Sequence, residues 1–227
     1  MISIWVIFGV FMLLSWLVGS RLKKKIKEYS RIPIGGGMSG AEIAAKMLRE
    51  SDIFDVEVVC VNGELSDHYN PAKKTVNLSP DVYNGRNIAS AAVAAHECGH
   101  AVQHSRAYLW LQMRSSLVPV VSLSSKYMQW ILLAGILMIN TAPQVLLVGI
   151  VLFALTTIFS FVTLPVEIDA SRRALVWLNT TGMTSAETHP KAQDALKWAA
   201  YTYVVAALSS LATLLYYIMI YMGGRRS

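Results

Sequence analysis

Four stretches of the chain are long, apolar and almost free of charged side chains. They comprise residues 1–20, 117–140, 145–165 and 199–222. A helix of about 20 apolar residues is long enough to cross the hydrocarbon core of a bilayer. The pattern therefore predicts a mainly α membrane protein with about four transmembrane helices.

The boundaries of these stretches support that interpretation. A turn containing Pro143 separates the second stretch from the third. The second must extend back past Lys126 towards Leu117 to cross fully, so Lys126 either snorkels to an interface or faces a wet cavity. The first could be a cleaved signal peptide. However, no basic residues precede it and RLKKKIK follows it at 21–27, which favours a retained membrane anchor.

Two polar segments remain, at 21–116 and 166–198. In the first, Ser39 and Glu42 have the spacing of a capping box and predict a helix to about Arg49. Three short strands are then predicted, at 55–61, from Leu65 to Tyr69 and at 74–79, with Asn62-Gly63 as a hairpin turn between the first two. A helix should begin near Asn87. We expect a small α+β domain with a short β-meander.

Composition and charge refine this picture. The chain is 54% hydrophobic, with a mean hydropathy of +0.44, which is too apolar for an ordinary soluble domain. Its net charge is +6, but 13 of its 20 Lys and Arg lie between Arg21 and Arg114 without forming one long patch, so we expect no nucleic-acid partner. The two polar segments carry 17 Lys and Arg and the turn at Pro143 carries none. This asymmetry predicts that both polar segments face the cytoplasm.

The clearest chemical signal is AAHECGHAVQH at 94–104, which contains His96-Glu97-Cys98-Gly99-His100. Residues four apart lie on one face of a helix, so both imidazoles can reach one Zn²⁺. Glu97 lies beside them and can take a proton from metal-bound water. The Cα of His104 would be about 12 Å from that of His96, too far for both to bind one ion.

A catalytic zinc needs a third protein ligand and an open fourth position. The residues alone leave four candidates. These are His68, His189, Glu167 and Asp169. The two acids lie in LPVEIDASRRAL at 164–175, where Pro165 would occupy the first turn of a helix and an acid is favourable with or without a metal. Since they are two residues apart, they cannot both face the metal from a helix.

Three motifs together resemble the YugP-type neutral zinc metallopeptidases. They are HECGHAVQH at 96–104, DHYNPAKKTVNLSPDVYNG at 67–85 and LPVEIDASRRAL, and the resemblance covers nearly the whole chain. The chain is more distantly similar to HtpX-type membrane proteases and CAAX prenyl endopeptidases, whose third ligand is the glutamate of E-x-x-A-D. The resemblance implies Glu167 as third ligand and gives Asp169 no counterpart role. Ser171 replaces the final aspartate, which leaves open whether this position supports a histidine and does not affect the zinc ligands themselves.

The resemblance further implies a zinc metalloendopeptidase. Zn²⁺ would be held by His96, His100 and Glu167 in a zincin-like site, with Glu97 as general base. An edge strand near 75–78 would align an extended substrate by strand addition. An oxyanion stabiliser is also expected. Its candidates are Arg172, Arg173, His104 and Tyr69.

The expected partners are the lipid bilayer and a peptide or membrane-protein substrate, with a regulatory membrane partner or a homo-oligomer as further possibilities. An alternative is a zinc-binding membrane scaffold or adaptor without turnover. Glu97 argues against it, because structural zinc sites are usually closed by four protein ligands. A transporter is disfavoured because the predicted spans carry almost no charge apart from Lys126.

Overall fold

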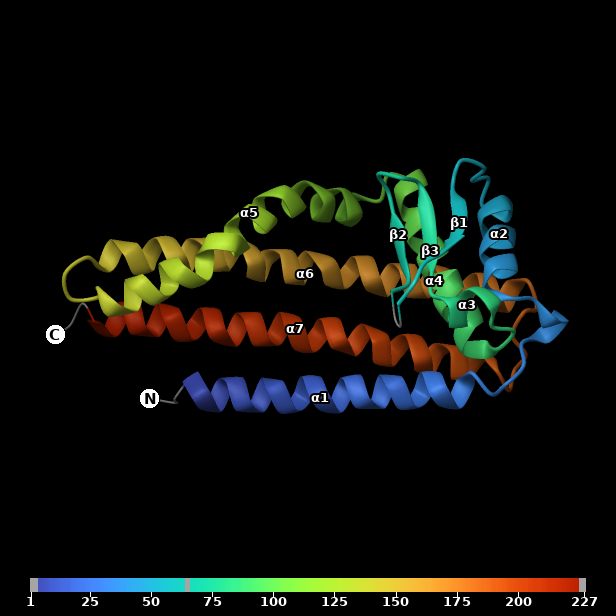
Figure 1. The fold of residues 1–227 in the computed structure, drawn as a ribbon, viewed down its shortest axis with the longest axis horizontal. Coiled ribbons are helices and arrows are strands. Elements are labelled where there is room, and N and C mark those ends of the chain that lie inside the picture. Colours follow the sequence, from blue (N-terminus) through green and yellow to red (C-terminus); the bar gives the residue numbers. More distant parts are fainter. Residues whose placement is uncertain (1–3, 64–65, 225–227) are drawn as a thin grey trace. The chain divides into compact units, whose positions relative to one another are not determined.

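The computed structural model describes residues 4–63 and 66–224 (Figure 1). The helices are α1 (Ile4–Tyr29), α2 (Gly40–Glu50), α3 (Pro80–Asn84), α4 (Ile88–Ser105), α5 (Leu109–Leu137), α6 (Pro143–Thr180) and α7 (His189–Gly224), with a 3-10 turn, η1, at Gly35–Gly37. The strands are β1 (Glu57–Cys60), β2 (His68–Asn70) and β3 (Thr75–Leu78). The predicted fold class, a mainly α protein with a small α+β part, is confirmed. The chain divides into two compact units, one made of 1–17, 112–164 and 202–227 and the other of 18–111 and 165–201.

Four helices, α1, α5, α6 and α7, are long and apolar enough to cross a membrane. This confirms the number of predicted spans. The expectation for Pro165 was wrong, because this residue lies inside α6 rather than in a first turn. A proline removes one backbone hydrogen bond, whereas ending the helix in an apolar segment would leave several backbone groups unsatisfied. The helix therefore runs on without interruption to Glu167 and beyond.

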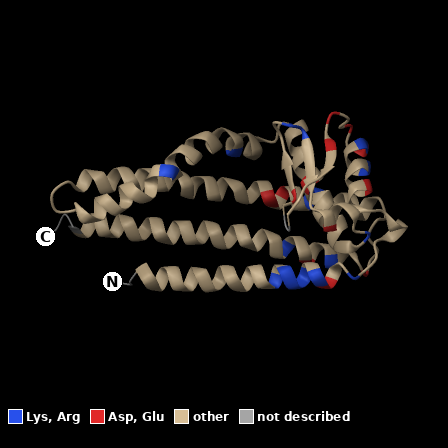
Figure 2. Ribbon diagram, in the orientation of Figure 1, with Lys and Arg blue, Asp and Glu red and all other residues tan. Residues whose placement is uncertain are grey.

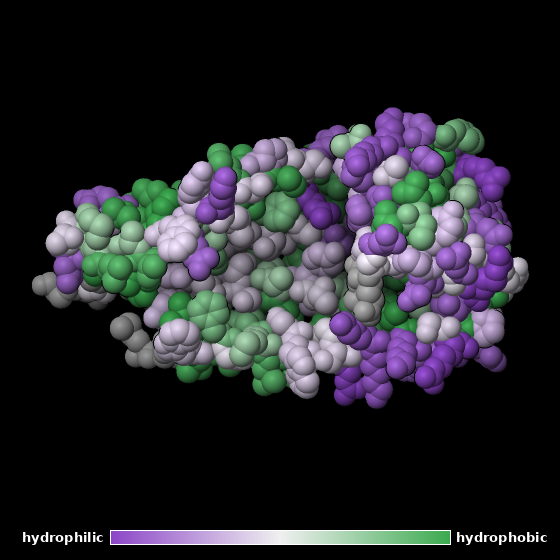
Figure 3. Space-filling view, in the orientation of Figure 1, coloured by the Kyte–Doolittle hydropathy of each residue, from purple (hydrophilic) through white to green (hydrophobic). Residues whose placement is uncertain are grey.

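The first unit buries few side chains. Its core cluster consists of Leu132 of α5 with Leu146 and Ile150 of α6. Many large apolar side chains remain at the surface, for example Trp5, which is 78% exposed, and Trp130, which is 69% exposed. Figure 3 shows hydrophobic side chains along the surface of these helices. Such a surface is suited to lipid rather than water.

The second unit has a larger core of its own. Its buried side chains come from α2, α4, β3 and the parts of α6 and α7 that belong to this unit. The alanines of α4 are small enough to pack it closely against its neighbours, and those at 91, 92, 94 and 95 are fully buried. Charged residues gather in this unit (Figure 2). The capping box of Ser39 and Glu42 is present at the start of α2, as predicted, and Asn87 caps α4 by accepting a hydrogen bond from the Ser90 N–H.

The three-stranded sheet is not the predicted β-meander. Its strand order is β1-β3-β2, with β1 parallel to β3 and β2 antiparallel to it. Asn62-Gly63 therefore does not join two paired strands, and part of the predicted second strand lies outside the described residues. The physical reason is burial: Val76 and Leu78 of β3 are fully buried, whereas β2 is short and partly polar. The apolar strand takes the centre of the sheet. The expectation that 75–78 form an edge strand was also wrong, because β2 and β1 form the edges.

Candidate metal centre

Two helices of the second unit bring three predicted ligands together. His96 and His100 are one turn apart on α4, and Glu167 lies on α6. The Oε2 atom of Glu167 is 3.3 Å from Nε2 of His96 and 3.6 Å from Nε2 of His100. Glu167 is only 3% exposed and His100 is buried, so the group is largely shielded from water. Within residues 4–63 and 66–224, these three form the group that could hold a metal ion.

Gly99 allows the two helices to come this close. A Cβ added at this position would lie 2.6 Å from the backbone carbonyl oxygen of Ala170. Backbone cannot give way as a flexible side chain can, so any larger residue would push α4 away from α6. The fully buried Ala170 and Ala174 continue this close packing along α6. Small residues at the helix contact thus set the distance at which the ligands meet.

The donor set fits zinc. Tetrahedral Zn²⁺ binds histidine nitrogen and carboxylate oxygen at about 2.0–2.2 Å, which places ligand atoms about 3.3 Å from one another. The distances from Glu167 to the two imidazoles match that spacing. Two imidazoles and one carboxylate are also the ligands of a zinc that keeps its fourth position open.

Each imidazole has a polar partner on its second nitrogen. The Nδ1 atom of His96 is 3.0 Å from the hydroxyl of Ser171, and Nδ1 of His100 is 3.1 Å from Oε1 of Gln103. With Nδ1–H donating to these oxygens, each Nε2 presents its lone pair to the metal position. The sequence left open whether Ser171 supports a histidine, and in the structure this shorter side chain reaches His96 with its hydroxyl.

Gln103 is the main residue that sequence reasoning missed. It is fully buried, and its Nε2 donates to the carbonyl of Val166 and to Oδ2 of Asp169, both at 2.8 Å. With both amide hydrogens used, only Oε1 remains for His100, which must then donate from Nδ1. The sequence feature that could have identified Gln103 is its position three residues after His100, on the same side of the helix and next to apolar residues.

Asp169 lies outside the metal group and has another role. Its Oδ2 accepts hydrogen bonds from Gln103 and from Nε of Arg173, the latter at 2.6 Å. The sequence correctly predicted that Asp169 and Glu167 point in different directions. It did not predict that Asp169 would hold Gln103, which in turn contacts His100.

Glu97 is buried beside the group and is held by the sheet. Its Oε2 accepts a hydrogen bond of 3.0 Å from the backbone N–H of Tyr69 in β2. The hydroxyl of Tyr69 lies 2.8 Å from Nδ1 of His104. These contacts bring the edge strand and the last turn of α4 to the predicted general base.

The other histidine candidates for third ligand lie elsewhere. His68 is exposed and its ring contacts the Ser66 carbonyl, while His189 contacts the Thr184 hydroxyl. Cys98 is fully buried on a different face of α4, where its thiol donates to the carbonyl of Ala44. Burial raises the pKa of this thiol, so it stays protonated and is not available as a thiolate ligand.

The electrostatics of the group favour a cation. Burial by itself lowers the pKa of His100, but the adjacent carboxylate of Glu167 and the negative charge of Glu97 outweigh this and raise the pKa. Two acidic side chains thus attract positive charge to one buried point. A divalent metal ion bound at this point would supply the positive charge that the two carboxylates favour.

Comparison with known proteins agrees with this geometry. The model of the family described as "Putative neutral zinc metallopeptidase" matches residues 4–222. The chain belongs to this family. A Bacillus subtilis (strain 168) protein named "Putative membrane protease YugP" is 38% identical to the chain over 212 residues, which is 93% of each protein. No solved structure matches the chain.

Membership of the neutral zinc metallopeptidases confirms the resemblance seen in the sequence. It gives the protein its reaction class, metal-dependent hydrolysis of peptides, and its cofactor, Zn²⁺. Together with the four long apolar helices, the relative named as a membrane protease indicates a membrane protein. His96, His100 and Glu167 are then the side chains available to that cofactor.

Proposed function

We propose that this protein is a membrane-embedded zinc endopeptidase in which His96, His100 and Glu167 hold the metal and Glu97 is the general base. The observation that carries this proposal is the convergence of two Nε2 atoms and one carboxylate oxygen within 4.8 Å of one another. A scaffold without turnover would have no need for a buried carboxylate beside a three-ligand site. The position of Glu97 therefore favours catalysis.

Zinc, when bound, supplies a Lewis acid that polarises a peptide carbonyl and acidifies water. The protein's own contribution is to hold and move protons. Since Oε2 of Glu97 accepts the Tyr69 N–H, its Oε1 is the atom that takes the proton from the attacking water. Glu97 then passes this proton to the nitrogen of the departing amine. Ser171 and Gln103 keep the two histidines in the orientation and tautomer that leave Nε2 unprotonated.

Strand addition to β2 would align the substrate. In an antiparallel pair, a residue whose N–H points away from the partner strand also points its carbonyl away. The Tyr69 N–H is directed at Glu97, so the Tyr69 carbonyl remains to accept an N–H from an extended peptide. Such a peptide would lie directly beside the general base.

Tyr69 and His104 are the better supported oxyanion stabilisers. They are hydrogen-bonded to each other and belong to the elements that hold Glu97. Arg173 is engaged by Asp169, and Arg172 lines a groove of about 420 Å³ with residues of α7 such as Gln193. Among the residues that the structure describes, neither arginine has a contact that would direct it to the metal group.

We place the metal centre on the cytoplasmic side of a bacterial cell membrane and expect membrane or membrane-associated proteins as substrates. Support comes from the basic residues of 20–116 and 165–198 and from their absence at the turn near Pro143.

Cys60, which is exposed on β1, should be protected from a membrane-impermeant maleimide in intact cells and should react once the membrane is permeabilised. Labelling of Cys60 in intact cells would place the site outside.

Glu97→Gln tests the proposed mechanism. The variant should keep about one equivalent of zinc and lose cleavage of an unfolded protein substrate by about 10²–10⁴-fold, because the ligands remain and only the base is removed. Glu57→Gln, an exposed position on β1, is the matched control and should cleave normally. Cleavage by Glu97→Gln at the natural rate would rule out Glu97 as the base.

A further inference from the structure

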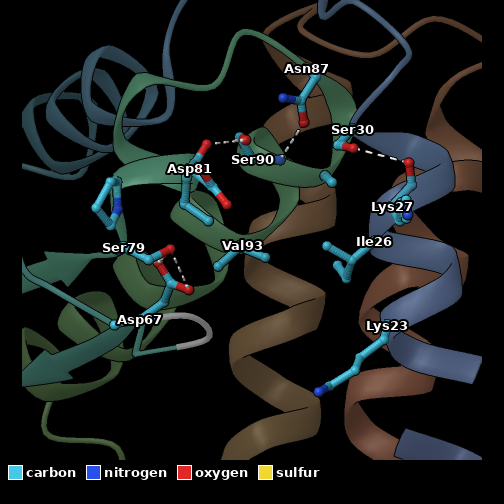
Figure 4. Close-up of a pocket in the computed structure, with 14 residues that line it drawn as sticks. Lys23, Ile26, Lys27, Ser30, Asp67, Ser79, Asp81, Asn87, Ser90 and Val93 are labelled. Carbon is cyan, nitrogen blue, oxygen red and sulfur yellow. Dashed lines mark hydrogen bonds between the residues drawn. The ribbon is translucent and has the colours of Figure 1, made fainter. Parts of the chain in front are cut away.

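A large cavity lies beside α4, on the N-terminal side of the metal ligands (Figure 4). Its volume is about 880 Å³. One wall is formed by Lys23, Ile26 and Lys27 of α1, and the opposite wall includes Asp67 and Ser79. All of these residues belong to the second unit. The cavity is large enough for several residues of a polypeptide.

Two of the elements that line the cavity, α4 and the segment that leads into β2, also carry residues of the metal group or of its surroundings. Between Ile88 and Gln103, Val93 and His96 are the positions of α4 that are not buried. They are three residues apart, so they share one face of the helix, and Val93 lines the cavity. On the other side, Asp67 precedes by two residues the Tyr69 N–H that binds Glu97. The cavity is thus framed by the same elements as the metal centre.

The spacing along α4 places the cavity in terms of substrate residues. Ala89, which also lines it, is seven residues from His96, or about 10 Å along the helix axis. An extended peptide advances about 3.3 Å per residue. A substrate that runs along α4 with its scissile bond at the metal would therefore reach the cavity with its second or third residue from that bond.

The charges of the cavity are separated between its walls. Lys23 and Lys27 are four residues apart on α1, and the described residues offer neither ammonium group a salt bridge. By contrast, their neighbour Lys25 pairs with Asp194 at 3.2 Å and with Glu28 at 3.4 Å. Across the cavity, Asp67 accepts hydrogen bonds from the N–H and hydroxyl of Ser79. The positive charge of the lining residues therefore lies on the α1 wall, whereas their negative charge, from Asp67 and Asp81, lies across the cavity from it.

We propose that this cavity is a specificity subsite in which Lys23 and Lys27 bind an acidic side chain of the substrate, two or three residues from the scissile bond. The inference rests on the proposed endopeptidase function and adds the class of substrate. A carboxylate inserted between Lys23 and Lys27 would gain two ionic contacts. The basic end of α1 thus does more than flank an apolar segment, because two of its lysines line a cavity next to the active site.

Quenched fluorescent peptides with one cleavage site provide the test, in neutral detergent without anionic lipid. Glu, Gln or Lys is placed two or three residues from that site, on either side. The natural protein should cleave the Glu peptide about fivefold better than the Gln peptide in kcat/KM, the scale of one or two partly exposed ion pairs. In Lys23→Gln/Lys27→Gln this preference should disappear, while the rate for the Gln peptide stays the same.

Lys24→Gln, which removes the same charge from a residue that does not line the cavity, should keep the preference for Glu. Lys23→Arg/Lys27→Arg should restore it. Equal cleavage of the Glu and Gln peptides by the natural protein would overturn the subsite while leaving the endopeptidase intact. The subsite would also be wrong if the double Gln variant lost activity equally on all peptides, since the lysines would then serve folding. It would likewise be wrong if the variant lost activity only in vesicles containing phosphatidylglycerol, since the lysines would then serve lipid binding. Failure to cleave any peptide would contradict the endopeptidase itself.

Discussion

Gly99 and Gly135 perform the same packing task in the two units, with different consequences. A Cβ at Gly135 would lie 2.5 Å from the Cα of Leu146, just as one at Gly99 would lie 2.6 Å from the carbonyl oxygen of Ala170. In the first unit this close approach joins α5 to α6 around apolar side chains. In the second unit it brings α4 to α6 at the point where Glu167 meets two histidines.

The difference shows what a buried charged site requires beyond close packing. An apolar helix contact is satisfied by shape alone, whereas burying a carboxylate and two imidazoles is costly unless each polar group has a partner. The second unit supplies these partners from its own helices. Ser171, Gln103 and Asp169 form the surrounding hydrogen bonds. A close helix contact at a glycine can therefore form part of a charged site only where such hydrogen-bond partners are present.

Gly99→Ala should have the largest effect. Because the added methyl group meets backbone, α4 must move away from α6, and the three ligands should lose their common centre. We expect zinc affinity to fall by more than about 100-fold and proteolysis to be lost, as measured by chelator competition and peptide cleavage. Gly19→Ala, at a helical glycine with no heavy atom within 4 Å of the new methyl group, is the control. Normal zinc affinity in Gly99→Ala would refute the role given to this contact.

Gly135→Ala should separate stability from metal binding. Overpacking of a helix contact costs about 1–3 kcal/mol, which corresponds to a decrease in Tm of about 2–12 °C for a protein of this size. Zinc affinity should stay unchanged, since the first unit provides no ligand. Thermal unfolding in detergent and a zinc titration of the same sample provide the measurement. An effect of Gly135→Ala on zinc as large as that of Gly99→Ala would remove the distinction between the two contacts.

Gln103→Leu should have a smaller effect on the metal than Gly99→Ala. It removes the hydrogen-bond partner of the buried His100 Nδ1–H and one hydrogen bond each from the Val166 carbonyl and the Asp169 carboxylate, which keeps its bond from Arg173. Loss of such support to a histidine ligand lowers metal affinity by about 10- to 100-fold. Competition with a chromogenic chelator measures it, and Gln112→Leu, at an exposed position, is the control. Unchanged zinc affinity would mean that Gln103 serves packing alone.

Much of this architecture could be predicted from local sequence patterns. The apolar stretches, the cap of Ser39 and the four-residue spacing of His96 and His100 each depend on neighbouring residues, and a single sequence records such relations directly. The choice of Glu167 came from a family resemblance and not from local pattern, because Pro165 made a helix start equally reasonable.

The features that escaped prediction depend on contacts between distant segments. Strand order is one of them, since nothing near Asn62-Gly63 shows that the buried Val76 takes the centre of the sheet and leaves β2 at its edge. The partners of the histidines are another. Ser171 and Gln103 lie on different helices, and their roles exist only because Gly99 lets those helices touch.

The central claim is that Glu167 completes a zinc site with His96 and His100, and metal content tests it most directly. Glu167→Ala, Asp169→Ala and the natural protein would be purified in one detergent and equilibrated with limiting buffered zinc. The natural protein and Asp169→Ala should retain about one equivalent, because Asp169 contacts the site only through Gln103. Glu167→Ala should lose most of its zinc. Full retention of zinc by Glu167→Ala, with loss in Asp169→Ala, would contradict the account.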